Sequence, residues 1–499
     1  MPFRKLDGRA RLAPVASTLA TLVALGTAWV ADDAYITLRT ADNFMHGYGL
    51  RWNVAERVQA YTHPLWLGLI TAAYSVTREP YFTVIALSIV LAVVAIHLLV
   101  RLVAVDVAAA IAAVLVLGLS KAFVDYATSG LETPLTYLLL VAFFIPYFRP
   151  LARFRLQSLA LVAALLALTD ATAVWLVLPA IAVTAWRDGW RRSIVPIVFG
   201  LWPVLIWEAF SVIYYGSLLP NPTYARLLSG MPHARIVKHG LVYLLDSVNL
   251  DPFTLGAIAF AGVLAFTDRI RGARPVAIGM AAYLAAVVWM GGDVLSGKLL
   301  AAPLLCASVV ISQLELATWP TSRRVELATI AAVLGLMAAR PMFSNVPMSR
   351  LPIVSETSGI VDARMRAYPR TGLLNARRES PWPEEPDVEG GRRPRSTEPD
   401  VRVMATGGLA GFYAGPLVHI VNSTGVGDPL LARIPAARPW GMGVPRRDLP
   451  PGYGETLNSG LPQVADPQLA ELYARLSLVA RGPIWSAPRW RAIASLVAP

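Results

Sequence analysis

The sequence predicts an all-α polytopic membrane bundle followed by a small C-terminal domain of α/β or α+β type. Of the 499 residues, 56% are hydrophobic and only 15% are charged, a balance that few soluble proteins have. Apolar runs recur from Pro14 to Ala339 and then stop. The chain therefore divides into a transmembrane domain over 1–339 and an extracytoplasmic domain over 340–499. The single cysteine, Cys306, excludes a disulfide framework.

About twelve apolar windows are candidate spans: 14–30, 64–77, 81–100, 107–120, 134–148, 157–169, 171–186, 194–214, 253–267, 275–291, 299–316 and 325–339. The basic clusters between them should be cytoplasmic. One assignment satisfies every cluster: window 64–77 lies at the membrane interface, and the other eleven windows cross. The membrane is expected to be a bacterial inner (plasma) membrane. The N-terminus is then on its cytoplasmic side, and the C-terminal domain is periplasmic. Trp29–Asp33 is a poor cleavage site, so 14–30 is expected to be an uncleaved first span.

The stretch from Ala31 to Trp66 is far more polar than its surroundings. It follows the first span directly and makes up most of the first outer loop, 31–80. Asp32 and Asp33 stand where that span should surface, ahead of a loop that contains aromatic residues and glycine turns. A solvated helix end is the alternative explanation, but ionisable groups at membrane depth are costly and usually functional.

Other acidic residues fall on or near the outer face in the same topology, although they were not used to choose it. They are Asp125, Glu132, Asp170, Asp251 and Asp293. The alternative is that loops carry charge in any protein. One outer loop reads GGDVLSGK and places Lys298 close to Asp293 at the end of a span.

The C-terminal domain shows weaker patterns. Residues 379–400 are rich in Pro, Glu and Arg and are expected to form a mobile segment. Residues 401–406 and 417–422 are typical of strands on either side of a Gly-rich turn, GGLAGFYAGP, and 467–478 of a helix. Residues 233–245, in the fourth outer loop, suit an interfacial amphipathic helix.

Two adjacent carboxylates suit the removal of a proton from a hydroxyl group. One can act as a general base, while the other raises its pKa, binds the substrate or helps to hold a cation such as Mg²⁺ or Mn²⁺. We favour Asp32 as the base and Asp33 as the supporting group. The sequence has no His/Cys cluster, which argues against zinc. Much of the net charge of +12 lies in short loops, where it sets topology and does not indicate nucleic-acid binding.

Five stretches together resemble the GT-C superfamily of polyprenyl-phosphate-sugar glycosyltransferases. They are DDAYITLRTADNFMHGYGLRWNVAERVQAYTHPLW, SGLETP, YYGSLLPNPTYARL, GGDVLSGK and GFYAGPLVHIVNSTGVGDPLLARIP, in this order along the chain. Within the superfamily the chain is most similar to the ZomB-like flagellar motor control proteins, which are related to the mycobacterial terminal arabinofuranosyltransferase. It departs from the family pattern at Leu168-Thr169-Asp170, where relatives have Arg-Pro-Asp, and at Lys298, where Arg is commoner.

The resemblance implies a polyprenyl-phosphate sugar donor, an extracytoplasmic acceptor such as a cell-envelope glycan, and a catalytic role for Asp32 and Asp33. Arabinofuranose is one sugar that the resemblance suggests. Its transfer would invert the anomeric carbon, because a direct displacement needs one carboxylate on the face opposite the leaving phosphate. The expected donor- or substrate-binding residues are Lys298, Asp293, Arg226, His63, Tyr61, Asp170 and Glu132.

Several of these residues have a structural alternative. A lipid phosphate must rest on cations or helix N-termini, and Lys298 is the preferred cation. The further candidates Arg226, Arg235 and Lys238 can equally be snorkelling interfacial side chains. His63 can orient the acceptor, bind the donor or be an ordinary loop histidine. Tyr61, Tyr48, Trp52 and Trp66 can stack on sugar rings or form the interfacial aromatic belt.

Two other functions compete with glycosyl transfer. A lipid or sugar transporter is disfavoured because the charged residues cluster in loops and the sequence shows no inverted repeat. Substitution of a mid-span polar residue such as Ser88 should then harm transport and spare transfer. A non-catalytic membrane organiser, linked to the flagellar motor or the envelope, would keep its function after Asp32→Asn and Asp33→Asn.

Overall fold

The computed structural model describes residues 8–149, 154–267, 270–336, 343, 358–376, 383, 396–404, 407–437 and 445–497. The chain is mostly helical and packs into two compact units. The first is built from 1–30, 84–204 and 233–376, and the second from 31–83, 205–232 and 377–499. Most of the segment expected to be mobile, 379–400, lies outside the described residues. The division of the chain at residue 339 into membrane and extracytoplasmic domains stays a prediction.

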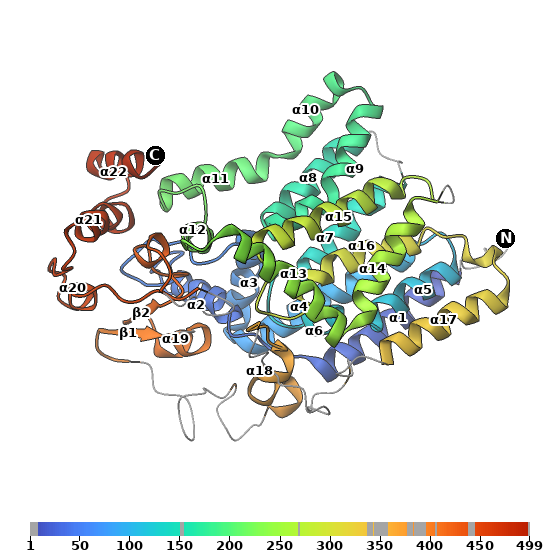
Figure 1. Cartoon of the computed structure of the whole chain (residues 1–499), viewed down its shortest axis with the longest axis horizontal. Helices are drawn as coiled ribbons and strands as arrows, with labels where there is room; N and C mark the ends of the chain where they lie inside the picture. The colour runs from blue at the N-terminus through green and yellow to red at the C-terminus, as the bar shows by residue number, and fades with distance from the viewer. Residues whose placement is uncertain are drawn as a thin grey trace. The chain divides into compact units, whose positions relative to one another are not determined.

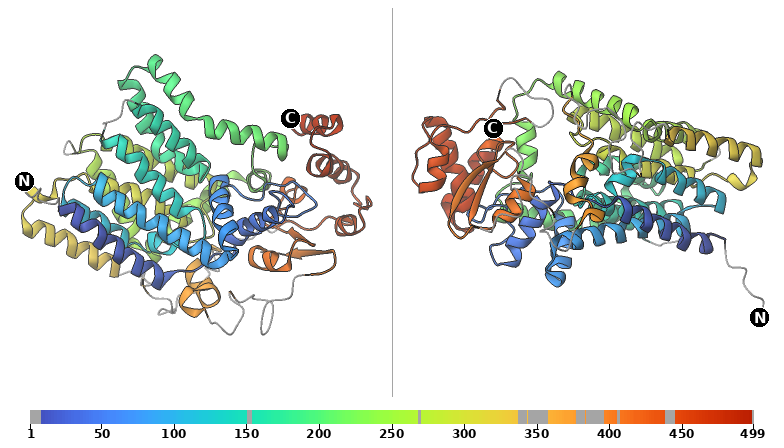
Figure 2. Two further views of the ribbon diagram at one scale, coloured as in Figure 1. Left: turned by 180° about the vertical axis from the view of Figure 1, so that it is seen from behind. Right: turned by 90° about the horizontal axis from the view of Figure 1, so that it is seen from below.

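The first unit is a bundle of helices, most of which are apolar. They are α1 (Gly8–Thr27), most of α4 (Pro80–Leu98), α5 (Val107–Gly118), α6 (Lys121–Tyr126), α7 (Thr133–Phe148), α8 (Arg155–Ala167), α9 (Val174–Arg187), α10 (Trp190–Gly200), α13 (His233–Leu250), α14 (Pro252–Ala265), α15 (Ala273–Met290), α16 (Ala301–Ile311), α17 (Thr321–Leu336) and α18 (Ala363–Thr371). Helices α7, α15 and α16 run side by side (Figures 1 and 2). Most of the predicted apolar windows are therefore helical.

Among the residues that the structure describes, three helical segments are long and apolar enough to cross a membrane: Gly8–Thr27, Pro80–Val103 and Ala273–Met290. Two bent pairs, α10 with α11 and α13 with α14, raise the number to five if each pair is one span. The window 194–214, predicted as one span, is bent by 51° between its two helices. Other apolar helices are shorter, and eleven spans stay a prediction.

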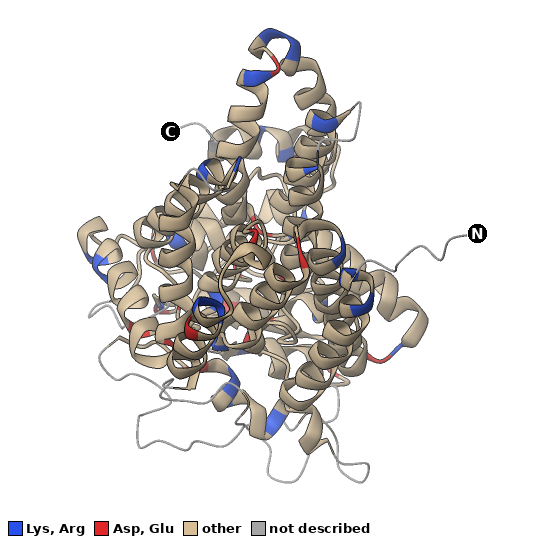
Figure 3. Ribbon diagram, turned by 90° about the vertical axis from the view of Figure 1, so that its right-hand side faces the viewer, with Lys and Arg blue, Asp and Glu red and all other residues tan. Residues whose placement is uncertain are grey.

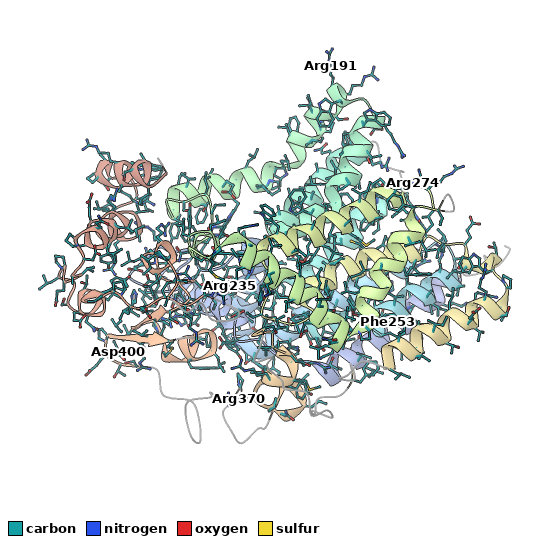
Figure 4. The ribbon with its side chains drawn as sticks, in the orientation of Figure 1. Arg191, Arg235, Phe253, Arg274, Arg370 and Asp400 are labelled. Atoms are coloured by element: carbon teal, nitrogen blue, oxygen red, sulfur yellow. The ribbon has the colours of Figure 1, made fainter. Side chains whose placement is uncertain are left out.

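Charged groups of the first unit lie at opposite ends of α7. Arg149, just after α7, donates to the carbonyl oxygen of Ala104 at 3.2 Å, and Arg9 donates to the same oxygen at 2.5 Å. Glu132 precedes α7 at its other end, about 24 Å away for this 16-residue helix. Basic residues also gather at the tip of the α9–α10 turn (Figure 3), where Arg191 lies (Figure 4). The predicted topology requires the basic residues at one end of helix α7 to be separated in this way from the acidic residue at the other end.

The second unit combines the first predicted loop with the described C-terminal residues. Its helices are α2 (Ala34–Met45), α3 (Pro64–Thr77), most of α11 (Trp202–Tyr214), α12 (Asn221–Leu227), α19 (Gly408–Ala414), α20 (Tyr453–Ser459), α21 (Pro467–Arg481) and α22 (Ala487–Val497). One apolar core joins Trp52 and Ala60 to Val418 and Ile420. A second contains Leu430, Tyr453, Tyr473 and Leu476. Segments that are far apart in sequence thus share a core.

The strands of the second unit differ from the prediction in how they are joined. β1 (Asp400–Met404) pairs in parallel with β2 (Val418–Asn422), from Asp400 opposite Val418 to Met404 opposite Asn422. Parallel neighbours need a crossover connection and cannot be joined by a tight turn. The expected Gly-rich turn is therefore wrong, because its residues form the short helix α19.

Candidate functional site

The loop GGDVLSGK follows α15 and lies against α13. Gly291 and Gly292 have φ angles of 88° and 67°, which favour glycine. A Cβ atom at Gly292 would lie 2.7 Å from the Cβ of Tyr243. The paired glycines therefore let the backbone approach α13 more closely than any other residue would allow.

Hydrogen bonds fix the shape of this loop. One carboxylate oxygen of Asp293 accepts from the backbone N–H groups of Val294, at 2.6 Å, and Leu295, at 3.3 Å. The Tyr243 hydroxyl donates to the carbonyl oxygen of Leu295 at 3.2 Å and accepts from the N–H of Leu299 at 3.0 Å. The backbone of Lys298, which lies between these two anchored residues, is thereby held in place.

Three predicted loops bring their charged residues together around Lys298. Its Nζ lies 3.7 Å from Oε1 of Glu132, in SGLETP, and 3.8 Å from Oδ2 of Asp293. Asp170, in the hairpin LTDAT, is close enough for both Lys298 and Glu132 to act on its pKa. The side chains of Lys298, Glu132 and Asp293 are 20%, 12% and 21% exposed, so none of them is fully buried. We call these four residues the Lys298 cluster.

Asp170 is a carboxylate of this cluster whose pKa is shifted by its surroundings. Burial raises the pKa of Asp170 to about 6, and the nearby Glu132 carboxylate adds to this effect. Lys298 and the backbone N–H groups of Thr172 and Ala173, which bond to the Asp170 carboxylate, act in the opposite direction. Asp170 therefore changes its charge near neutral pH.

In the second unit, Asp32 and Asp33 form a turn just before α2. The Asp32 carboxylate accepts from the backbone N–H groups of Gly408, at 3.2 Å, and Leu409, at 2.9 Å, at the start of α19. A Cβ atom at Gly408 would lie 1.8 Å from the backbone oxygen of Asp32. Both aspartates are exposed. Asp32 thus fastens the turn to the glycine-rich segment.

Two residues that sequence reasoning missed hold the same loop in place. Arg39, in α2, is 2% exposed and donates to the carbonyl oxygens of Trp52, Gly411 and Val418. Asn53 donates to the carbonyl oxygen of Ile420 and accepts from its N–H. In the sequence, Arg39 and Asn53 are simply polar residues within the stretch that begins DDAYITLRT. That pattern does not distinguish them from residues on the surface.

Comparison with known proteins identifies a distant relative. Over 328 residues the chain is 28% identical to the terminal beta-(1->2)-arabinofuranosyltransferase of Mycobacterium tuberculosis, covering 56% of this chain and 51% of that protein. The chain thus spans about half the length of this relative. No family model and no solved structure matches the chain. With its apolar helices, this likeness points to a membrane protein. Sequence similarity to a glycosyltransferase supports the GT-C superfamily, and the ZomB-like assignment stays a prediction.

The remaining predicted residues of the second unit differ in accessibility. Tyr61 is 2% exposed, its hydroxyl lies 2.8 Å from that of Tyr215, and its ring contacts Trp207. Trp52 and Trp66 are also buried, so stacking of a sugar on these three rings is not supported by their positions, whereas Tyr48 is 38% exposed.

His63 and the candidate cations are accessible to different degrees. Nε2 of His63 lies 2.7 Å from the Thr37 hydroxyl, and the side chain is partly exposed. Arg226 on α12 is exposed in the second unit. Arg235 and Lys238 are exposed on α13 in the first unit (Figure 4 labels Arg235). Among the described residues, no group of three or more His, Cys, Asp or Glu side chains is arranged to hold a metal ion.

Proposed function

We propose that the protein is an integral-membrane inverting glycosyltransferase that moves a sugar, with arabinofuranose as the first candidate, from a polyprenyl-phosphate donor to a cell-envelope glycan. The observation that carries this proposal is the Lys298 cluster, which gathers a cation and carboxylates from three loops of the same unit. The distant likeness to an arabinofuranosyltransferase supports the reaction class. The protein would act in a bacterial inner membrane and face a periplasmic acceptor.

Lys298 would contact the donor phosphate, and the carboxylates would accept hydrogen bonds from sugar hydroxyls. The two ion pairs of Lys298, with N···O distances of 3.7 and 3.8 Å, are longer than a tight N⁺–H···O⁻ bond of about 2.7–2.9 Å. To bind a phosphate, the ammonium would turn from these two carboxylates toward the donor. Protonation of Asp170 would make the cluster less negative and favour an anionic ligand.

Asp33 would be the general base and Asp32 its positioning neighbour, which reverses the order favoured by the sequence. Two backbone N–H bonds stabilise the charged form of the Asp32 carboxylate and fix its direction. A base must be aimed at the acceptor hydroxyl. Asp33 lies in the turn that Asp32 fixes, so its position is set by those two bonds.

Transfer can be tested with the purified protein in detergent or liposomes. It would receive polyprenyl-phosphate arabinofuranose and an arabinan oligosaccharide, and mass spectrometry would detect the elongated product. Release of polyprenyl phosphate with an inverted linkage is the expected result. No product with this donor or with other polyprenyl-phosphate sugars, from protein shown to be folded, would reject the proposal.

Lys298→Met is expected to raise the KM for the donor by about ten- to a hundredfold, because a hydrogen bond to a charged group contributes about 1.5–3 kcal/mol. Lys298→Arg keeps the charge and should change KM much less. Donor titrations of both variants, with circular dichroism as the folding control, check this. An unchanged KM in Lys298→Met would remove this residue from the donor site.

Donor affinity is expected to fall as pH rises through about 6, the pKa to which burial raises Asp170. Deprotonation adds a negative charge near Lys298, which disfavours the donor phosphate. Asp170→Asn keeps the hydrogen-bond acceptor without the charge, so its donor KM should vary less between pH 5 and 7.5. The measurement is KM against pH for both proteins, and identical profiles would contradict the assignment.

Eleven spans are expected to place the two chain ends on opposite sides of the membrane. Reporter fusions after Pro150 and Asp188 should then report the cytoplasm, and a fusion after Arg340 the periplasm. A crossing of 64–77 would invert every later fusion, and these reporters would detect it.

A further inference from the structure

Residues 358–376 pair directly with the loop that carries Lys298. Val361 forms a parallel bridge with Leu295: its N–H donates to the carbonyl oxygen of Val294 at 2.7 Å, and its carbonyl oxygen accepts from Ser296 at 2.9 Å. The His239 ring adds a second link, with Nδ1 2.6 Å from the carbonyl oxygen of Gly291 and Nε2 3.0 Å from that of Ser358. The backbone of this segment therefore supports the loop from one side.

Four buried charged residues anchor the same segment. Arg364 is fully buried and its Nε lies 2.7 Å from Oδ1 of Asp125. Lys121 bonds to the other oxygen of Asp125 and lies 3.4 Å from Oδ1 of Asp362. Asp362 also accepts from the N–H of Met365 and so caps α18. Two cations thus face two anions, a balance that buried charges require. We call Lys121, Asp125, Asp362 and Arg364 the buried quartet.

The quartet and the loop border one small cavity. Its lining includes Lys121, Asp125 and Asp362 from the quartet, and Ser296 and Gly297 from the loop. Gly297 immediately precedes Lys298, and the Tyr126 hydroxyl donates to the carbonyl oxygen of Ser296 at 2.9 Å. A shift of the quartet would therefore displace backbone atoms within one or two residues of Lys298.

The other side of the segment holds the last residues of the first helix. The Tyr368 hydroxyl donates to the carbonyl oxygen of Gly26 at 3.1 Å, and the N–H of Leu373 donates to that of Ala28 at 2.8 Å. Trp29 donates from its indole to the carbonyl oxygen of Asp125 at 2.7 Å. Ala28 is only four residues ahead of Asp32 in the chain, so the segment contacts both the Lys298 loop and the peptide that leads into the aspartate pair.

We infer that the buried quartet positions Lys298 for the donor by clamping Val361 against the loop, and that Asp362 and Arg364 are positioning residues of the transfer reaction. This inference rests on the proposed function. It assigns a role to charged residues that lie away from the reacting groups. Loosening the clamp should weaken donor binding more than it slows the chemical step, because Val361 bonds directly to the Lys298 loop, whereas Asp32 keeps its own two bonds to Gly408 and Leu409.

The test uses the full-length protein and two kinds of variant. The double variant Arg364→Met/Asp125→Asn removes one ion pair as a unit and leaves Lys121 paired with Asp362, since removing a single partner would strand a buried charge. Val361→Pro removes the N–H bond to Val294 and substitutes no residue of the quartet, and Val361→Ala is its matched control. Hydrogen exchange of residues 291–298 and donor KM and kcat are measured for each protein.

Faster exchange across 291–298, a donor KM raised at least about tenfold and a kcat changed less than about threefold are expected for the double variant and for Val361→Pro. Folded variants with unchanged exchange or unchanged KM would overturn the inference. If the double variant does not fold, Val361→Pro alone decides. The exchange measurement does not require activity, so a wild-type protein that transfers no sugar would reject the proposed function separately.

Discussion

Asp33→Asn is expected to lower turnover by about 10²–10⁴-fold, the usual contribution of a general base. The substitution keeps the size of the side chain and its place before α2 but removes the group that would take the acceptor proton. Donor binding should be nearly unchanged, because the proposed phosphate contact is Lys298. Single-turnover rates with saturating donor, together with a donor-binding isotherm, separate the two effects.

Asp32→Asn provides the contrast for this assignment. It weakens the two bonds to Gly408 and Leu409, so it should reduce turnover less than Asp33→Asn and should raise hydrogen exchange at the start of α19. If Asp32→Asn is the inactive variant and Asp33→Asn is not, the roles are the reverse of those proposed. Full turnover in both variants would remove the pair from the chemistry.

Most of the apolar helices were predictable because each depends on a local signal. In the first unit, 107–120 and 134–148 differ from α5 and α7 by one or two residues, and in the second unit the window 64–77 coincides with α3. An apolar run of this length in a membrane-like composition leaves few alternatives to a helix. The bend between α10 and α11 was missed, because the apolar pattern continues through it.

The gathering of Glu132, Asp170, Asp293 and Lys298 could be anticipated only in outline. The positive-inside rule put these residues near one face, and the structure adds that they meet. Arg364 gave no comparable signal, because its partner Asp125 lies 239 residues away in the sequence. Long-range pairs of this kind depend on packing and not on local pattern, so a single sequence does not reveal them.

The Gly-rich stretch GGLAGFYAGP shows how a correct local signal led to a wrong element. Glycines favour turns, and a turn between two strands was the simplest interpretation. The structure uses Gly408 for close approach instead, since the backbone of Asp32 fills the space that a side chain would take. A glycine is needed at position 408 because Asp32, some 370 residues earlier in the chain, lies against it.

Gly408→Ala should therefore be among the most damaging conservative substitutions in the chain. The added methyl group would lie 1.8 Å from the backbone oxygen of Asp32, so the turn that holds Asp32 and Asp33 must move. A displacement of about 1 Å at a catalytic group can cost about 10²-fold in rate. We expect a loss of turnover of that order, with the donor KM close to that of the wild type.

Gly68→Ala is the matched control, because Gly68 lies in α3 of the same unit and a Cβ atom there would meet nothing within 4 Å. Turnover of both variants is compared, with hydrogen exchange over residues 31–36 as a measure of the turn itself. Faster exchange and low turnover confined to Gly408→Ala are expected. Wild-type turnover in Gly408→Ala would show that the contact between Asp32 and the start of α19 is not needed for activity, and Asp32 would then lose its proposed positioning role.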